Sequence, residues 1–175
     1  MKTTCLLIAT VALLASCKEK PTQVTAAPAK VASAALAAVL ATPPTGEPQS
    51  IHLVRSSAKP GDVITLSGRI MGNAKPFVDG RAAFILGDPK ILTACNDSPG
   101  DKCETPWDAC CDSPEDKKRG IATIQIVDAD GRVLKEGIEG VGGLKNLATV
   151  TVTGKVADGS SADLMLVNAT AIRVP

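Results

Sequence analysis

Aromatic side chains are almost absent from this chain of 175 residues, which contains two phenylalanines, one tryptophan and no tyrosine. A hydrophobic core must therefore be built from Val, Ile, Leu and Ala, which belong to the 45% of residues that are apolar. Because only 21% of residues are charged, wholesale disorder is not expected. The 19 basic and 18 acidic residues nearly cancel, which argues against a partner such as nucleic acid that is held by bulk charge.

Histidine is equally scarce, and the sequence lacks the common catalytic motifs. The single His52 excludes most histidine-based metal cages and catalytic sites. Ser56 and Ser57 lie close to His52, but no nucleophile elbow or oxyanion-type glycine motif surrounds them, so we interpret His52 as a surface residue. The sequence contains neither a phosphate-binding loop nor a dinucleotide fingerprint. We therefore expect a protein that is not an enzyme and needs no cofactor.

The N-terminal segment predicts export. A short positive start precedes residues 6–14, an uncharged apolar run that is too short to span a bilayer but suits the core of a signal peptide. The run ends in Leu14-Ala15-Ser16-Cys17, which resembles the lipobox of bacterial lipoproteins. The resemblance implies that residues 1–16 are removed and that Cys17 carries a diacylglyceryl thioether and an acylated amino group, which together anchor the chain to a membrane. The alternative is an ordinary secretory leader in which Cys17 is incidental.

The residues after Cys17 predict a location and a spacer. Lys18, rather than Asp, follows the cysteine. In Gram-negative lipoproteins this pattern resembles the signal for the default route to the outer membrane, where the protein would face the periplasm. Residues 17–48 are rich in Ala and Pro and predict a flexible tether. Within it, residues 29–41 favour a helix by composition but lack a polar face, so we expect a frayed helix in a spacer. A helix that binds a partner is the alternative.

Residues 49–175 predict an all-β domain. Short β-branched runs at 62–70, 81–86, 122–127, 149–156 and 164–174 are separated by turn residues, and the Thr/Val alternation of 149–156 is typical of a strand with one buried face. Asp128 and Asp130 lie in a tight-turn pattern before a short run at 132–134. Three glycines between residues 140 and 143 predict a loop or a single turn. Five strands with a longer connection before the fourth resemble the OB-fold, a small Greek-key barrel. A β-sandwich is the alternative.

Four cysteines outside the leader lie in one long loop, at about 88–119, between the second and third predicted strands. They are Cys95, Cys103, Cys110 and Cys111. An even number of cysteines in an exported chain predicts two disulfides that order the loop. A bond between the adjacent Cys110 and Cys111 would be strained, so we expect each of them to pair with Cys95 or Cys103. The two arrangements remain open.

The same four cysteines permit a second interpretation, a metal site or a redox-active thiol group. Thiolates suit zinc or a soft copper ion. However, the sequence has no Cys-x-x-Cys spacing, and the surrounding carboxylates are expected to raise the thiol pKa values and weaken nucleophilicity. We therefore favour disulfides and no metal.

Trp107 lies within this loop and is the candidate binding residue. It either packs on the disulfides or forms an exposed anchor for a partner. The motif Thr105-Pro106-Trp107-Asp108-Ala109-Cys110-Cys111 resembles a loop in a family of small exported bacterial proteins without an assigned activity. This resemblance implies a shared fold and loop and supplies no function.

Two functions from different classes follow. The first is a lipoprotein on the outer side of the cytoplasmic membrane that carries a non-enzymatic binding or structural module for an envelope protein or polymer. The second is a metal-handling or thiol-redox lipoprotein that uses Cys95, Cys103, Cys110 and Cys111. A nucleic-acid role is not expected, because OB-folds that bind nucleic acid stack bases on aromatic residues in a basic groove.

Overall fold

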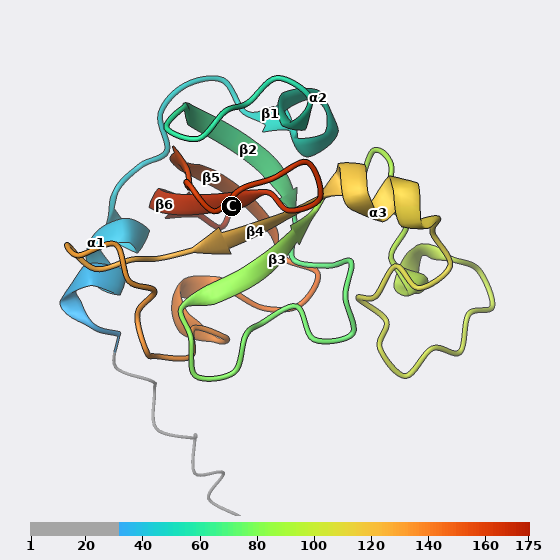
Figure 1. Cartoon of the computed structure of the whole chain (residues 1–175). Helices are drawn as coiled ribbons and strands as arrows, with labels where there is room; N and C mark the ends of the chain where they lie inside the picture. Colours follow the sequence, from blue (N-terminus) through green and yellow to red (C-terminus); the bar gives the residue numbers. More distant parts are fainter. Residues whose placement is uncertain (1–31) are drawn as a thin grey trace, which may run out of the picture.

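The structure is a computed structural model that describes residues 32–175 (Figure 1). The predicted signal peptide, the lipid-bearing Cys17 and the first part of the predicted tether lie outside the described residues. Among residues 32–175, no helix is long and apolar enough to cross a membrane.

Five strands close into a barrel. They are β2 (Val63–Arg69), β3 (Ala83–Gly87), β4 (Ile121–Gln125), β5 (Thr149–Val156) and β6 (Leu166–Arg173). They neighbour one another in the order β2-β3-β4-β6-β5, and β5 pairs with β2 to complete the ring. The β4–β6 pairing is parallel and the others are antiparallel. A two-residue strand, β1 (Gln49–Ser50), adds to β2 in parallel. The prediction of a domain built mainly from strands around a closed five-stranded barrel is confirmed.

The barrel interior is aliphatic, as the shortage of aromatics requires. Phe84 of β3 is the one aromatic side chain among residues 32–175 that is fully buried. The side chains around it are almost all branched aliphatics that are at most 1% exposed, among them Leu66, Ile124, Val150, Val152, Val167 and Ile172. Branched aliphatic residues on a pleated surface fill such an interior without voids.

Gly154 marks an irregularity in the barrel wall. The register between β5 and β6 shifts between Thr153 and Gly154. A Cβ atom at Gly154 would lie 2.5 Å from the carbonyl oxygen of Asn168 on β6. Only glycine permits this close approach of the two backbones.

The flexible tether predicted for residues 17–48 is corrected where the structure describes it. Residues 34–41 form α1 (Ala34–Ala41), whose Leu36 is fully buried in the core and which packs against β6. Ser33 caps this helix by accepting a hydrogen bond from the Leu36 backbone N–H at 3.2 Å. Further along, the Thr45 backbone N–H donates to the hydroxyl of Thr153 at 3.0 Å. The prediction was wrong here because tertiary packing of an apolar side chain stabilises a helix that is too short to form alone.

The all-β prediction also missed two short helices. They are α2 (Ile51–Arg55), which follows β1, and α3 (Pro114–Gly120), which precedes β4. The signals for α3 are in the sequence, since Ser113 caps the helix, Pro114 occupies its first turn and basic residues occupy its last turn. The predicted run at 132–134 forms only an isolated bridge between Val127 and Val133. The glycine-rich stretch forms a single turn, η2 (Val141–Gly143), as expected.

Candidate functional site

All four loop cysteines and Trp107 lie between β3 and β4, in residues 88–120, which we call the cysteine segment. Figure 1 shows this segment extending to one side of the barrel, with α3 returning the chain to β4. A second hydrophobic cluster lies beneath it and consists of Met71, Leu92, Ala94 and Ala109. The segment is therefore packed through apolar contacts of its own.

Trp107 ties the cysteine segment to the chain that leaves β2. Its indole N–H donates to the carbonyl of Ala74 at 3.0 Å, and its own carbonyl accepts from the backbone N–H of Gly72 at 2.9 Å. These two bonds fix both the backbone and the ring plane, and the side chain remains half-exposed. Trp107 thus packs on the loop after β2 and still presents part of its ring to solvent.

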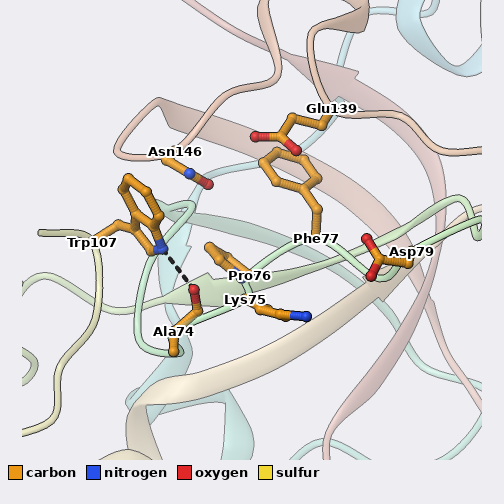
Figure 2. A pocket seen from close by; sticks show the side chains of 8 residues that line it. All are labelled: Ala74, Lys75, Pro76, Phe77, Asp79, Trp107, Glu139 and Asn146. Atoms are coloured by element: carbon orange, nitrogen blue, oxygen red, sulfur yellow. Dashed lines mark hydrogen bonds between the residues drawn. The ribbon is translucent and has the colours of Figure 1, made fainter. Parts of the chain in front are cut away.

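A pocket of about 250 Å³ opens beside Trp107 (Figure 2). The residues that line it come from three connections of the barrel and are Ala74, Lys75, Pro76, Phe77, Asp79, Trp107, Glu139 and Asn146. The sequence contains three aromatic residues, and the two that remain partly exposed, Phe77 and Trp107, both line this pocket. The remaining exposed aromatic surface is thereby gathered at one place.

The polar groups of this pocket favour a donor of hydrogen bonds. Two carboxylates, those of Asp79 and Glu139, line the pocket together with one ammonium group, that of Lys75. The side-chain oxygen of Asn146 is buried and has no hydrogen-bond partner within residues 32–175. In Figure 2 the amide of Asn146 lies between the rings of Trp107 and Phe77, and Glu139 lies over Phe77. A buried acceptor without a donor is costly, so this oxygen is suited to receive one from outside the chain.

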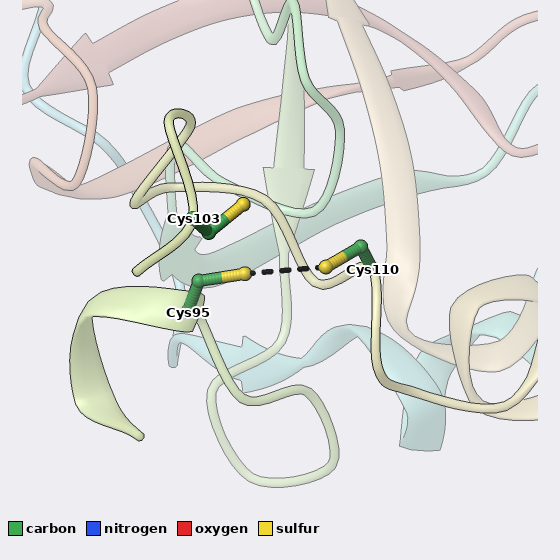
Figure 3. A group of neighbouring side chains, drawn as sticks. All are labelled: Cys95, Cys103 and Cys110. Atoms are coloured by element: carbon green, nitrogen blue, oxygen red, sulfur yellow. Dashed lines mark hydrogen bonds between the residues drawn. The ribbon is translucent and has the colours of Figure 1, made fainter. Parts of the chain in front are cut away.

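The cysteine segment brings three thiols together (Figure 3). Cys95 begins the single turn η1 (Cys95–Asp97), and its backbone N–H donates to the Asp108 carbonyl at 2.8 Å. The Sγ atoms of Cys95 and Cys110 are 3.4 Å apart, and the Sγ atoms of Cys95, Cys103 and Cys110 all lie within 4.8 Å of one another. Cys111 contacts the group at one point, with its Sγ 3.9 Å from that of Cys110. All four cysteines are free thiols in this structure, and the predicted disulfides stay a prediction.

The pKa values of these thiols follow from burial and from contacts within the cluster more than from the carboxylates of the segment. Burial, followed by hydrogen bonds with Cys110 and Cys103, raises the pKa of Cys95 to about 12. The Thr105 side chain and backbone lower the pKa of Cys103 by hydrogen bonding to its thiolate. The pKa of Cys111 is raised mainly by Cys110, and Asp101 is a lesser cause. The expected rise in pKa is found for Cys95 and Cys111, although burial and neighbouring thiols are its main causes, and the expectation is wrong for Cys103, whose pKa is lowered.

His52, which is partly buried, pairs with a buried carboxylate, and sequence reasoning missed this pair. Its Nδ1 lies 2.7 Å from a carboxylate oxygen of Asp88, and its backbone N–H donates to the same oxygen at 3.1 Å. Asp88 is only 1% exposed. Burial raises the pKa of Asp88, but the hydrogen bonds from His52 and from the Lys90 backbone outweigh burial and hold it below its ordinary value. No local signal reveals the pair, because the two residues are 36 positions apart.

The two serines near His52 form hydrogen bonds to backbone carbonyls of α2. The hydroxyls of Ser56 and Ser57 donate to the carbonyls of Leu53 and Val54 in α2. Asp128 forms the turn that the sequence predicted, accepting backbone hydrogen bonds from Asp130 and Gly131. These polar residues are accounted for by local structure.

Comparison with known proteins identifies no relative: no family model, no curated protein and no solved structure matches the chain.

Proposed function

We propose that the protein is a lipoprotein of the cell envelope, anchored through Cys17 on the outer side of the cytoplasmic membrane, which carries a small OB-like barrel as a non-enzymatic binding module. The lipobox pattern supports the anchor. The strand order supports the OB-like Greek-key topology, because a meander of β2, β3 and β4 is followed by two strands that return to pair with β4 and β2.

The pocket beside Trp107 is the observation that carries the binding role. Fold alone does not imply function, so the ligand must be argued from the chemistry of the lining residues. The pocket combines two aromatic faces, two carboxylates and a buried acceptor without a partner. An ammonium or guanidinium group satisfies all three, since it stacks on aromatic rings, pairs with carboxylates and donates hydrogen bonds. The module therefore binds an envelope protein or polymer that presents a cationic group.

Trp107 provides the test, because it is the one tryptophan of the chain and its fluorescence reports on this pocket alone. The full chain in detergent is titrated with tetralysine, and tetraglutamate serves as the matched probe of opposite charge. We expect a saturable change with tetralysine that weakens with salt, and none with tetraglutamate. Equal responses to both peptides would refute a cation-binding pocket.

Charge variants of the pocket sharpen the test. Replacing Asp79 by Asn and Glu139 by Gln together should weaken tetralysine binding about tenfold, because exposed charge pairs contribute at most about 1 kcal/mol each. Lys75→Gln removes the competing positive charge and should strengthen binding. If both changes act in the same direction, the electrostatic argument fails.

A further variant tests binding of the envelope partner itself. The Trp107→Ala protein should fold but recover less of that partner from envelope extracts than the unchanged protein does.

The anchor has a separate test. Cys17→Ala should release the protein from membranes or leave the precursor uncleaved, as seen by fractionation and by the mass of the intact chain. Membrane attachment and processing that persist unchanged in this variant would contradict the lipid anchor and leave the pocket argument standing.

A further inference from the structure

Three cysteine side chains converge from three points of the cysteine segment (Figure 3). Cys95 lies in η1, Cys103 lies in irregular chain beyond the turn that follows η1, and Cys110 lies beyond Trp107. Their sulfur atoms lie within 4.8 Å of one another, and the shortest separation, between Cys95 and Cys110, is 3.4 Å. The cluster is thus a triangle of thiols and not a set of separate pairs.

The size of this triangle matches the coordination shell of a metal ion. Sulfur lies about 2.3 Å from zinc, so two thiolates on one tetrahedral ion are about 3.8 Å apart. The observed separations, from 3.4 Å to at most 4.8 Å, bracket that value. A disulfide, by contrast, joins two sulfurs at about 2.05 Å and gives no role to a third thiol at similar distance.

The surrounding structure holds the triangle without any bond between the sulfurs. Backbone hydrogen bonds join Cys95 to Asp108 and Asn96 to Pro106, both at 2.8 Å. The guanidinium of Arg69 on β2 pairs with Asp97 at 2.5 Å. With the hydrophobic cluster beneath, these contacts position the thiols before any ligand binds, which lowers the cost of ordering a site.

An ion can reach the sulfurs from solvent. A cavity of about 140 Å³ is lined by Cys95 and Cys103 together with Asn96, Ser98, Asp101 and Pro106. Cys95 is buried, Cys103 is half-exposed and Cys110 is exposed, so the triangle spans the boundary between the segment's interior and solvent. Asp101 lines the same cavity, and its carboxylate favours the approach of a cation.

We propose that Cys95, Cys103 and Cys110 bind one thiophilic cation with a filled d shell, either Zn²⁺ or Cu⁺. Thiolates are soft ligands that select these ions over Mg²⁺ and Ca²⁺, which prefer oxygen. On binding, three thiols release three protons to solvent and form three sulfur–metal bonds, with no change of oxidation state. Three thiolates suit three-coordinate Cu⁺, and they leave a fourth position open on Zn²⁺. This site is independent of the pocket that binds a cationic group.

Two adjacent cysteines provide a matched control. Cys110 and Cys111 are neighbours and both are exposed, but only Cys110 belongs to the triangle. Cys110→Ser should therefore weaken metal binding at least a hundredfold, whereas Cys111→Ser should change it less than threefold. If the four cysteines instead form two disulfides, Cys110→Ser and Cys111→Ser should have similar effects, because each substitution leaves one disulfide partner unpaired. Cys103→Ser is a second test at a half-exposed position, chosen because the substitution is tolerated sterically.

The experiment measures the mass of the mature chain, purified in detergent, under native and then denaturing conditions. The reduced protein is titrated anaerobically with Zn²⁺ alone and, separately, with Cu⁺ alone, and competition with a chelator of known affinity ranks the two ions. We expect one ion per chain, binding that is weakened at least a hundredfold in Cys110→Ser and in Cys103→Ser, and circular dichroism that is unchanged in all variants. A freshly isolated chain that is four hydrogens short of the reduced mass would overturn the proposal, as would equal losses at Cys110 and Cys111.

Discussion

The barrel and the cysteine segment are stabilised by different kinds of interaction. The barrel is a closed ring of paired strands around a continuous aliphatic core that also takes in Leu36 of α1. The cysteine segment contains only a few buried apolar residues and otherwise depends on individual hydrogen bonds, such as those of Trp107 with Ala74 and Gly72. Stability in the barrel is therefore shared among many residues, whereas in the segment single contacts decide the conformation.

Both candidate sites lie outside the barrel strands, in connections whose conformation depends on single contacts. The barrel residues line neither the thiol triangle nor the aromatic faces of the pocket, which come from the connections between strands. A scaffold of high stability can carry connections of lower stability, and this is the usual division in binding proteins. The comparison predicts that damage to the barrel unfolds the whole molecule and that damage to the segment stays local.

The largest effect is expected for Phe84→Ala. Phe84 is the largest fully buried side chain, and its loss leaves a cavity that aliphatic neighbours fill only in part. The free energy of unfolding should fall by about 3–5 kcal/mol, with one cooperative transition in urea by both circular dichroism and Trp107 fluorescence. Separate transitions would show that the barrel and the segment unfold independently even when the barrel is weakened.

A smaller and more local effect is expected for Leu92→Ala. Leu92 is 3% exposed in the small cluster beneath the cysteine segment. The cost should lie near the low end of such substitutions, about 2 kcal/mol, because a small cluster relaxes more easily than a closed barrel. Trp107 fluorescence should change at lower urea concentration than circular dichroism. If the fluorescence and circular dichroism transitions coincide at the midpoint of the unchanged protein, the segment does not unfold separately from the barrel.

The same division explains what the sequence could and could not predict. Alternation along residues 149–156 predicted β5 with correct bounds, because burial of every second residue is a local signal. Leu36 was placed in a spacer, because only the core surface that it contacts makes its helix stable. The thiol triangle and the pocket beside Trp107 depend on contacts such as Trp107 with Ala74, 33 residues apart, for which single-sequence patterns carry no information.

Asp88 lies at the boundary between the barrel and the cysteine segment, because it follows β3 and is the first residue of the segment. Its carboxylate accepts hydrogen bonds from His52 and from the Lys90 backbone while almost fully buried. Asp88→Asn should cost about 1–3 kcal/mol at neutral pH, measured by urea unfolding. His52→Gln is the matched change on the partner and should cost less, because it leaves the backbone hydrogen bonds of Asp88 in place.

The cost of Asp88→Asn should depend on pH with a defined sign. The pKa of Asp88 is lowered from its ordinary 3.8 in the folded state, so the folded chain binds fewer protons here than the unfolded chain. The stabilisation is then complete above pH 3.8 and is lost as the pH falls through the lower, folded-state pKa. The difference between the unchanged protein and the variant should shrink below that pH. A difference that grows as the pH falls below 3.8 would mean that the pKa of Asp88 is raised in the folded protein and not lowered.

The smallest effect is expected for Trp107→Phe, which separates the two roles of this residue. The substitution removes the 3.0 Å hydrogen bond from the indole N–H to Ala74 and keeps an aromatic ring beside the pocket. Because Ala74 is exposed and its carbonyl regains water, the loss should be about 0.5–1 kcal/mol by urea unfolding with circular dichroism. Tetralysine binding, measured by calorimetry, should weaken only a few-fold, whereas Trp107→Ala should abolish it, since cation–π attraction needs a ring but not an indole. If Trp107→Phe abolishes tetralysine binding as Trp107→Ala does, binding depends on the hydrogen bond by which the indole N–H anchors the segment. Cation–π attraction would then not explain binding in this pocket.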